Sequence, residues 1–247
     1  MNAKHAPRVS VCMATYNGQD YVTEQIQSIL EQLSPEDELI VVDDASRDGT
    51  VDVVRSLGDP RIVLLANPEN RGYVASFERA ITASKGEFIL LSDQDDVWLP
   101  GRLDLLVNSL QDKKFVASNF SVFGGPANKL QKVQLKQADG PRWIANLITT
   151  WIGVRPYYGC TMAFRAAGKK LILPFPAFLN ETHDQWIAIV GNLHRDMAHV
   201  ETATVARRLH DQNTTPKSRR PLTVIFRARI MLLRAFLVAL ARKLGKQ

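Results

Sequence analysis

Short apolar runs alternate with helical patterns through the first 110 residues of the chain. The apolar runs are rich in β-branched residues, and the segments between them carry apolar residues at helical spacing or turn residues. The predicted strands are 9–13, 39–42, 62–66 and 88–91, and the predicted helices are 21–33, 50–57 and 73–83. Strands joined by helical crossovers form parallel sheets, and continuous apolar strands indicate helices on both faces. The pattern therefore predicts an α/β fold with a mostly parallel, Rossmann-like sheet flanked by helices.

Beyond residue 110 the pattern is weaker. We expect strands at 114–123 and 159–165, a long polar connection over 124–141, and a helix that begins at 184–191. Residues 202–209 fit a strand or a helix equally well, because their periodicity favours neither.

Polar side chains follow three of the four predicted strands. They are Thr15, Tyr16 and Asn17 after the first strand, Asp43 and Asp44 after the second, and Asp93, Asp95 and Asp96 after the fourth. Ligands of parallel sheets bind beyond the carboxyl ends of the strands, so we expect one shared site there. Three carboxylates in four positions repel one another unless a cation or dense hydrogen bonding compensates them, and Mg²⁺ or Mn²⁺ suits such oxygen ligands. A solvated acidic turn, and a turn or capping role for Asp44, are the open alternatives.

Charge is spread unevenly along the chain, which is +6 overall. Residues 207–247 hold eleven Lys or Arg against one acid, whereas residues 1–206 hold twenty against twenty-four. This split argues against nucleic acid as a partner of the acidic body. Residues 221–247 predict a basic amphipathic helix that lies on an anionic membrane surface. Packing on the body or against another subunit are the alternatives.

Other features of the sequence concern its compartment. Cys12 and Cys160 lie in apolar stretches and predict small buried side chains without a disulfide framework, as in a reducing cytosol. Residues 1–8 lack the apolar core of a secretory signal, and no apolar run reaches the length of a membrane span. We therefore expect a cytoplasmic protein that is peripheral at the inner face of the cell membrane.

Four segments, in order, resemble the family-two glycosyltransferases of the GT-A fold. They are 9–18, 41–50, 70–72 and 92–103, and a thinner likeness over 155–213 is similar to a bacterial rhamnosyltransferase-like branch. Enzymes of this family move a sugar from a nucleotide diphosphate donor to an acceptor and invert the anomeric carbon. The resemblance implies a metal-dependent inverting hexosyltransferase of bacterial cell-surface polysaccharide synthesis. It implies a GT-A domain over 1–215, with a nucleotide-sugar half (1–110) and an acceptor and catalytic half (111–215), and a C-terminal helix over 216–247.

Roles for single residues follow from the same resemblance, position by position. The donor-binding residues would be Thr15, Tyr16, Asn17, Asp44, Arg71 and Asp93, with Asp44 at the pyrimidine and Asp93 near the ribose. Asp95 would hold the Mn²⁺ or Mg²⁺ that bridges the diphosphate, and Asp184 would be the catalytic base. An inverting transfer needs one such carboxylate to take the proton of the acceptor hydroxyl. A helix cap is the alternative for Asp184.

Further positions near the chain's end and several aromatic residues complete the predicted site. His210 is a second candidate metal ligand, although the family run Tyr-Arg-Arg-His is interrupted here by Leu209, and a surface or core position is the alternative. Arg207 and Arg208 are alternative partners of the diphosphate. We expect Trp98 under the metal loop, and Trp151, Tyr157 and Tyr158 beside the acceptor, with core packing as the competing interpretation.

The partners and the competing functions follow. The rhamnosyltransferase likeness favours dTDP-L-rhamnose as the donor and a UDP-sugar next, with a saccharide or a lipid-linked saccharide as the acceptor. A nucleotidyltransferase shares the acidic loop but needs a Gly-rich basic loop after the first strand, which residues 14–18 lack. A nucleotide- or RNA-binding module is disfavoured by the acidic body. A non-catalytic relative is disfavoured by Asp95 and Asp184.

Overall fold

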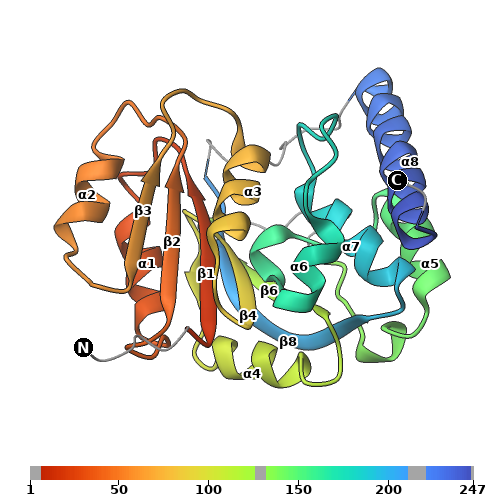
Figure 1. Cartoon of the computed structure of the whole chain (residues 1–247), viewed down its shortest axis with the longest axis horizontal. Coiled ribbons are helices and arrows are strands. Elements are labelled where there is room, and N and C mark those ends of the chain that lie inside the picture. The colour runs from red at the N-terminus through yellow and green to blue at the C-terminus, as the bar shows by residue number, and fades with distance from the viewer. Residues whose placement is uncertain (1–6, 126–131, 211–220, 246–247) are drawn as a thin grey trace.

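The computed structural model describes residues 7–125, 132–210 and 221–245 (Figure 1). The strands in this part of the chain are β1 (Val9–Thr15), β2 (Glu38–Asp43), β3 (Ile62–Ala66), β4 (Phe88–Asp93), β5 (Val97–Trp98), β6 (Phe115–Phe123), β7 (Met162–Arg165) and β8 (Met197–Arg208). The α-helices are α1 (Val22–Leu30), α2 (Thr50–Ser56), α3 (Tyr73–Ala83), α4 (Arg102–Ser109), α5 (Trp143–Ile152), α6 (Ala166–Ile172), α7 (His183–Leu193) and α8 (Leu222–Lys243), and two short 3₁₀ turns are η1 (Gln137–Asp139) and η2 (Gly159–Thr161).

The strands form one eight-stranded sheet in the order β3-β2-β1-β4-β7-β6-β8-β5. Neighbours are parallel from β3 to β4 and again between β6 and β8. β7 runs antiparallel to both β4 and β6, and β5 runs antiparallel to β8. The predicted α/β fold with a mostly parallel, helix-flanked sheet is confirmed, and the antiparallel strands belong to its second half.

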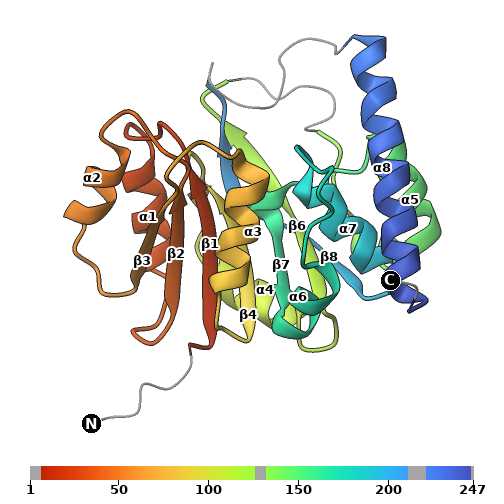
Figure 2. The same cartoon turned by 45° about the horizontal axis from the view of Figure 1, so that its top comes forward.

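Both faces of the sheet are covered by helices, which explains the continuous apolar strands (Figure 2). Along β1, Val11 and Met13 face the helices α1, α2 and α4, whereas Cys12 faces the helices α3, α6 and α7. The same alternation holds in β2, where Val41 and Val42 enter opposite layers. Apart from the half-buried Ala14 and Glu38, the side chains of these two strands are removed from water.

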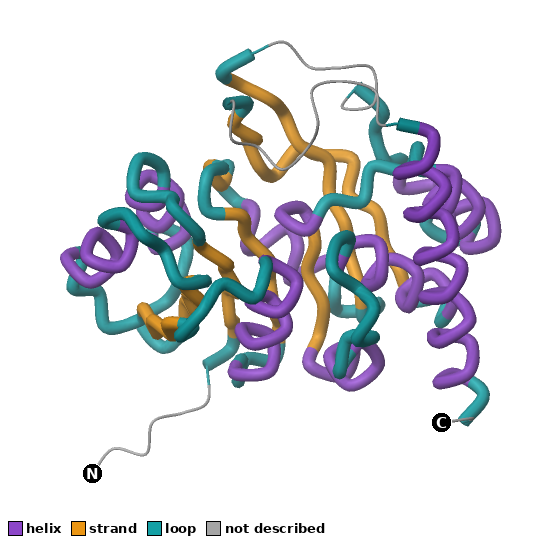
Figure 3. Tube along the Cα trace, turned by 90° about the horizontal axis from the view of Figure 1, so that it is seen from above, coloured by secondary structure: helices purple, strands orange, loops and turns teal. Residues whose placement is uncertain are grey.

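One end of the molecule has an additional layer of helices. α7 is buried along most of its length, because α5 and α8 pack against its outer side. Figure 3, seen from above, places α5 and α8 together at the end of the molecule opposite α2. Among the described helices, none is both long and apolar enough to cross a membrane.

The second half of the chain differs from its sequence prediction in several elements. Residues 202–209, left open between strand and helix, lie mainly in β8, and the strand expected at 159–165 starts as the turn η2 before β7. The helices α4, α5 and α6 and the strand β5 were not predicted. The polar connection at 124–141 contains η1, and its residues 126–131 lie outside the described residues. The expected domain boundary at 215/216 also lies outside them.

Candidate active site

The loops that follow β1 and β4 are joined at the carboxyl edge of the sheet. The backbone N–H of Tyr16 donates to Gln94 Oε1 at 2.8 Å, and Gln94 Nε2 donates to the Tyr16 carbonyl at 3.1 Å. A Cβ on Gly18 would lie 2.3 Å from Gln94 Oε1, so this position requires glycine. The polar segments after the first and fourth predicted strands are therefore in contact, and Tyr16 is partly exposed.

The loop after β2 is held against the loop after β1. The Asn17 N–H donates to Ser46 Oγ at 2.9 Å, and Asn17 Oδ1 accepts from the Arg47 N–H at 2.8 Å. Asn17 has φ +48°, a left-handed conformation that asparagine tolerates better than most residues. Deeper in the sheet, Thr15 Oγ1 donates to Asp43 Oδ1 at 3.1 Å. Thr15 and Asn17 thus fix the loops, and their contact with a nucleotide stays a prediction.

Asp44 has a structural task in the protein itself. Its carboxylate is almost fully buried and accepts hydrogen bonds from Asn67 Nδ2 at 2.7 Å, from the Arg71 N–H at 2.9 Å and from the Gly72 N–H at 2.7 Å. Gly72 has φ +84°, which the turn before α3 requires. The Asp44 side chain therefore orders the Asn70-Arg71-Gly72 turn, and a contact with a pyrimidine stays a prediction.

The Arg71 side chain lies apart from the acidic loop. It is exposed and, with Asn67, Glu78 and Arg79, lines a surface hollow of about 390 Å³ beside α3. The residues that line this hollow include none of the carboxylates that follow β4. The Arg71 side chain thus borders this hollow, and its contact with a donor stays a prediction.

The acidic loop after β4 leads directly into β5, and β5 brings it beside the end of β8. Because Val97 pairs with Ala206, Asp96 lies next to Arg207 and Arg208. The Arg208 N–H donates to Asp96 Oδ1 at 3.1 Å, and Arg207 Nε lies 4.0 Å from Asp96 Oδ2. Arg208 also donates to the carbonyl of Asp95 at 3.0 Å and pairs with Glu24. The two arginines expected at a diphosphate are engaged with the acidic loop.

Asp93, Asp96 and Cys160 bring one ligand atom each to within 4.8 Å of one another. Asp96 is buried, and its Oδ2 atom accepts no hydrogen bond from the described residues. Burial raises the pKa of Asp93 to about 6 and that of Asp96 to about 8; the charge of Asp95 adds to both shifts, and the charge of Asp93 adds to that of Asp96. The charge of Arg207 opposes these shifts without cancelling them. A divalent cation would supply the compensation that the side chains lack.

Arg102 is a site residue that the sequence reasoning missed. It is buried at the start of α4, where it donates to Thr204 Oγ1 at 2.5 Å and to the Cys160 carbonyl at 2.6 Å, and its guanidinium lies 4.7 Å from the Trp98 ring centroid. Burial lowers its pKa to about 10. Trp98 is buried against this arginine, which agrees with its expected place under the acidic loop.

Asp95 and His210, the two predicted metal ligands, lie together. Their Oδ2 and Nε2 atoms are 2.7 Å apart, although Leu209 interrupts the expected run. The imidazole of His210 stacks on Tyr21 with ring centroids 4.6 Å apart. The pair combines a carboxylate and an imidazole, both of which suit Mn²⁺, at the edge of the acidic cluster.

Asp184 lies in the first turn of α7. The helix cap is Thr182, so the structure does not give Asp184 the N-cap position that was the alternative to the base role. Its Oδ1 atom accepts from the Gln185 N–H at 2.7 Å. Burial, followed by the charge of Asp93, raises the pKa of Asp184 to about 7. A carboxyl with such a pKa suits proton transfer at neutral pH.

His183, the residue before Asp184, packs its ring against aromatic residues of α3. Its ring stacks on Phe77 at 4.3 Å and meets Tyr73 edge-on at 5.6 Å. Burial lowers the pKa of His183 to about 3, so the ring is neutral at physiological pH. A Cβ on Gly159 would lie 2.7 Å from His183 Nε2, which explains the glycine there.

The aromatic residues expected beside the acceptor are divided by the structure. Tyr158 lies near the acidic cluster, where the Arg207 guanidinium is 4.4 Å from its ring centroid. Tyr157 is instead buried, with its hydroxyl 2.8 Å from His199 Nε2, and belongs to the core. Trp151 lies on α5 and donates to the Arg229 carbonyl of α8 at 3.1 Å. Tyr157 therefore fits the competing interpretation of core packing, and a contact of Trp151 with the acceptor stays a prediction.

The structure also refines the charge split of the sequence. Arg207 and Arg208 were counted with the basic tail, but both belong to β8 and face the acidic loop. Their positive charge offsets part of the negative charge of the site's carboxylates. The other cations counted with the tail belong to the C-terminal part of the chain.

Comparisons with known proteins agree with this arrangement. Residues 10–171 match the family model Glycosyl transferase family 2. The Escherichia coli UDP-Glc:alpha-D-GlcNAc-diphosphoundecaprenol beta-1,3-glucosyltransferase WfgD is 31% identical over 116 residues, 46% of each chain. The chain spans about half the length of these curated relatives.

Solved structures share the fold at low sequence identity. S. aureus TarS 1–349 in complex with UDP-GlcNAc has a TM-score of 0.71 and 18% identity, over 92% of this chain and 66% of TarS. The mannosyltransferase PcManGT from Pyrobaculum calidifontis, in complex with GDP-Man and Mn²⁺, has a TM-score of 0.60 and 19% identity, over 98% and 76% of the two chains. These likenesses show the fold.

Proposed function

The chain belongs to glycosyl transferase family 2, and on that premise we propose that it transfers a sugar from a nucleotide diphosphate donor to a saccharide hydroxyl with inversion. The observation that carries this proposal is the position of Asp184. Its carboxyl faces the acidic loop after β4 closely enough for the charge of Asp93 to raise its pKa, which is about 7. One proton acceptor on one side of the site and a cation-binding cluster on the other suit an inverting transfer.

In the proposed reaction Asp184 is the general base. Its carboxylate takes the proton of the acceptor hydroxyl while that oxygen forms a bond to the anomeric carbon. The bond between the anomeric carbon and the diphosphate oxygen breaks on the opposite face, so the configuration inverts. Neutral His183, packed on Phe77, keeps the first turn of α7 in place.

Asp95 and His210 would hold Mn²⁺ or Mg²⁺, with the carboxylates of Asp93 and Asp96 close by. Their fit is supported by the 2.7 Å approach of Asp95 and His210 and by the unpaired Oδ2 atom of Asp96. When bound, the cation offsets the negative charge that grows on the leaving diphosphate. Arg207 and Arg208 then hold the acidic loop in place from β8.

We propose a pyrimidine nucleotide sugar as the donor, bound by Thr15, Tyr16, Asn17, Asp44, Arg71 and Asp93. WfgD is named as a UDP-Glc glucosyltransferase, and the TarS structure is a complex with UDP-GlcNAc; both support a UDP-sugar as the donor. dTDP-L-rhamnose rests on the sequence resemblance alone and is the competing donor.

A saccharide on a lipid carrier is the proposed acceptor, in the synthesis of a cell-surface polysaccharide. WfgD is named for a diphosphoundecaprenol-linked acceptor, which supports a lipid-linked substrate for this chain. The enzyme would then work at the inner face of the cell membrane, where the segment 221–247 contacts anionic lipid.

The test is a transfer assay with defined anomers. The full chain is incubated with Mn²⁺, with UDP-Glc, UDP-GlcNAc or dTDP-L-rhamnose, and with a prenyl-diphosphate-linked saccharide, and the new linkage is assigned by NMR. We expect a product with the anomeric configuration opposite to that of the donor, and none when a chelator replaces Mn²⁺. A product that retains the donor configuration would contradict the proposal.

A further inference from the structure

The helix α5 has its polar and apolar faces reversed relative to an ordinary surface helix. Asn146 and Thr150 are buried, and both donate hydrogen bonds nearby: Asn146 Nδ2 to the Asp139 carbonyl at 2.9 Å and Thr150 Oγ1 to the Asn146 carbonyl at 2.7 Å. The exposed face is apolar instead, with Ile144, Ile148, Trp151 and Ile152 between 46% and 55% exposed. The contact of these apolar side chains with water is unfavourable.

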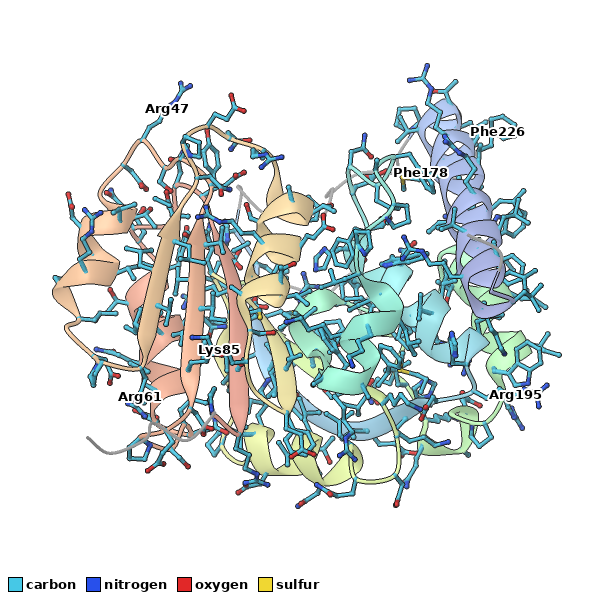
Figure 4. All side chains as sticks on the ribbon, in the orientation of Figure 1. Arg47, Arg61, Lys85, Phe178, Arg195 and Phe226 are labelled. Carbon is cyan, nitrogen blue, oxygen red and sulfur yellow. The ribbon has the colours of Figure 1, made fainter. Side chains whose placement is uncertain are left out.

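The helix α8 is apolar on two opposite faces. Its inner face buries Ala228, Leu232, Ala235 and Ala239. Its exposed apolar residues lie two positions before each of these: Phe226 (66% exposed), Ile230 (45%), Leu233 (50%) and Leu237 (54%). Two residues of an α-helix turn it by about 200°, so the second row points away from the body. Figure 4 shows Phe226 on the side of α8 that faces away from the sheet.

The two reversed faces belong to one surface, because the helices are joined. Trp151 Nε1 donates to the Arg229 carbonyl at 3.1 Å, and the Arg229 guanidinium donates to the Ile152 carbonyl at 2.6 Å. Figures 1 and 2 show α5 and α8 side by side at the same end of the molecule. We call this apolar patch, made by the eight exposed residues above, the α5–α8 surface. Contiguous exposed apolar patches of this kind mark interaction sites.

Cations surround the α5–α8 surface, and neither of its segments carries an acid. Residues 141–155 and 221–247 contain no Asp or Glu. Arg227 and Lys243 are exposed, and Arg234 lies at the flank of α8, with its guanidinium 4.3 Å from the Phe178 ring centroid. An apolar centre flanked by these cations is complementary to anionic lipid headgroups above an apolar interior.

We propose that the α5–α8 surface docks on an anionic membrane, with Ile148, Trp151, Phe226 and Leu233 in the headgroup and acyl boundary. A second copy fits less well, because a two-fold contact would place the cations of one copy against those of the other. This inference deepens the proposed membrane location. In this inference the membrane is contacted by α8 and also by α5, and α5 lies inside the catalytic half of the chain.

The experiment is cosedimentation of the full chain with vesicles, without donor or acceptor. Vesicles of phosphatidylcholine alone are compared with vesicles that contain one third phosphatidylglycerol. The test variant is Ile148→Ser/Phe226→Ser/Leu233→Gln, which changes exposed side chains only. Its control is Val63→Ser, because Val63 is 40% exposed on β3 at the other end of the molecule. Removal of the tail is unsuitable, since it would uncover the face of α7 that α8 buries.

We expect the wild type to bind the anionic vesicles. Each buried methylene is worth about fourfold in partition, so the triple variant should bind at least about tenfold more weakly, and Val63→Ser should bind like the wild type. Arg227→Gln should weaken binding about fivefold, and Lys85→Gln, which alters an exposed cation far from the surface, should not.

Three results would overturn the proposal: no binding of the wild type to anionic vesicles, equal binding of the triple variant, or a dimer in sedimentation velocity that the triple variant abolishes. The last result would assign the surface to a second copy. Transfer to a soluble acceptor is measured separately, so failure of the surface and failure of the transferase proposal are distinguishable.

Discussion

The acidic cluster at the end of β4 and the α5–α8 surface depart from normal burial in opposite directions. At the cluster, Asp96 and Arg102 are charged groups that the fold removes from water. At the α5–α8 surface, Phe226 and Ile148 are large apolar groups that the fold leaves in water. The helices α1 and α3 follow the ordinary rule, burying apolar residues such as Ile26 and Phe77.

We infer from this contrast that each of the two regions binds a further partner, and that the two partners differ in kind. Buried carboxylates with raised pKa values need positive charge, which a cation supplies. Exposed apolar rows need a surface that excludes water, which a lipid boundary supplies. A sugar transfer to a lipid-linked acceptor would use both regions together.

The largest expected effect concerns the base. Asp184→Asn keeps the size of the side chain but removes its ability to accept a proton, so the transfer rate should fall roughly 10²- to 10⁴-fold. Donor affinity, measured by calorimetry, should stay within about twofold of the wild type. Asp104→Asn is the matched control, because Asp104 is also an acid in a first helical turn, that of α4. Near-wild-type turnover of Asp184→Asn would remove the assignment.

The next effect separates the two faces of α8. Leu232 is 1% exposed and Leu233 is 50% exposed, although they are neighbours on one helix. Leu232→Ala should lower the free energy of unfolding by about 2–4 kcal/mol, and Leu233→Ala should change it by no more than about 0.5 kcal/mol. Urea denaturation measures both. Equal losses of unfolding free energy in the two variants would mean that Leu233 is packed within the protein, which would contradict an exposed apolar face on α8.

A smaller effect is expected for cation binding. Asp95→Asn removes one carboxylate from the pair with His210, so the affinity for Mn²⁺ should fall at least about tenfold. Asp112→Asn, at an exposed position after α4, should leave that affinity unchanged. Titration calorimetry with Mn²⁺ compares the two variants. Unchanged Mn²⁺ affinity in Asp95→Asn would place the cation elsewhere.

The smallest effect is on the pH dependence of stability. The pKa of Asp184 is about 7 and that of Asp96 is about 8 in the folded protein, whereas both are near 4 when unfolded. Between about pH 8.5 and 7 the folded form therefore takes up protons and the unfolded form does not, so stability should rise as the pH falls. Below about pH 6.5 His183, whose pKa folding lowers to about 3, opposes this trend.

The measurement is Tm in the presence of a chelator across that window. We expect a rise of a few degrees from pH 8.5 to 7 and a smaller rise in Asp96→Asn. Mn²⁺ should raise Tm most at pH 8.5, where the carboxylates are most fully ionised. A Tm that falls toward pH 7 would contradict the burial of uncompensated carboxylates.

The parallel half of the fold could be predicted from the sequence because its signals are local. The run from Ile62 to Ala66 and the helix from Tyr73 to Ala83 have the predicted bounds, since turn residues delimit both. The edge of the sheet that gathers Tyr16, Gln94 and the acids was also predictable, because parallel strands end at the same side.

Several elements from β5 onward could not be predicted because they depend on distant partners. β5 has only two residues, and its pairing with β8 places Asp96 beside Arg207, which no local pattern reveals. Arg102 follows a Gly and looks like a surface residue until α4 packs it under Trp98. The reversed pattern of α5 has the helical period, but the apolar stripe does not show which side faces the body.

The account's central claim is that the carboxyl edge of the sheet binds a nucleotide diphosphate together with a divalent cation. The most direct measurement is a thermal-shift series with UDP, dTDP and GDP, each with Mn²⁺ and with a chelator. We expect UDP or dTDP to raise Tm by several degrees with Mn²⁺ only, since a ligand at about 100 times its Kd adds roughly 2.7 kcal/mol. No shift with any nucleotide, or the same shift in the chelator, would contradict the claim.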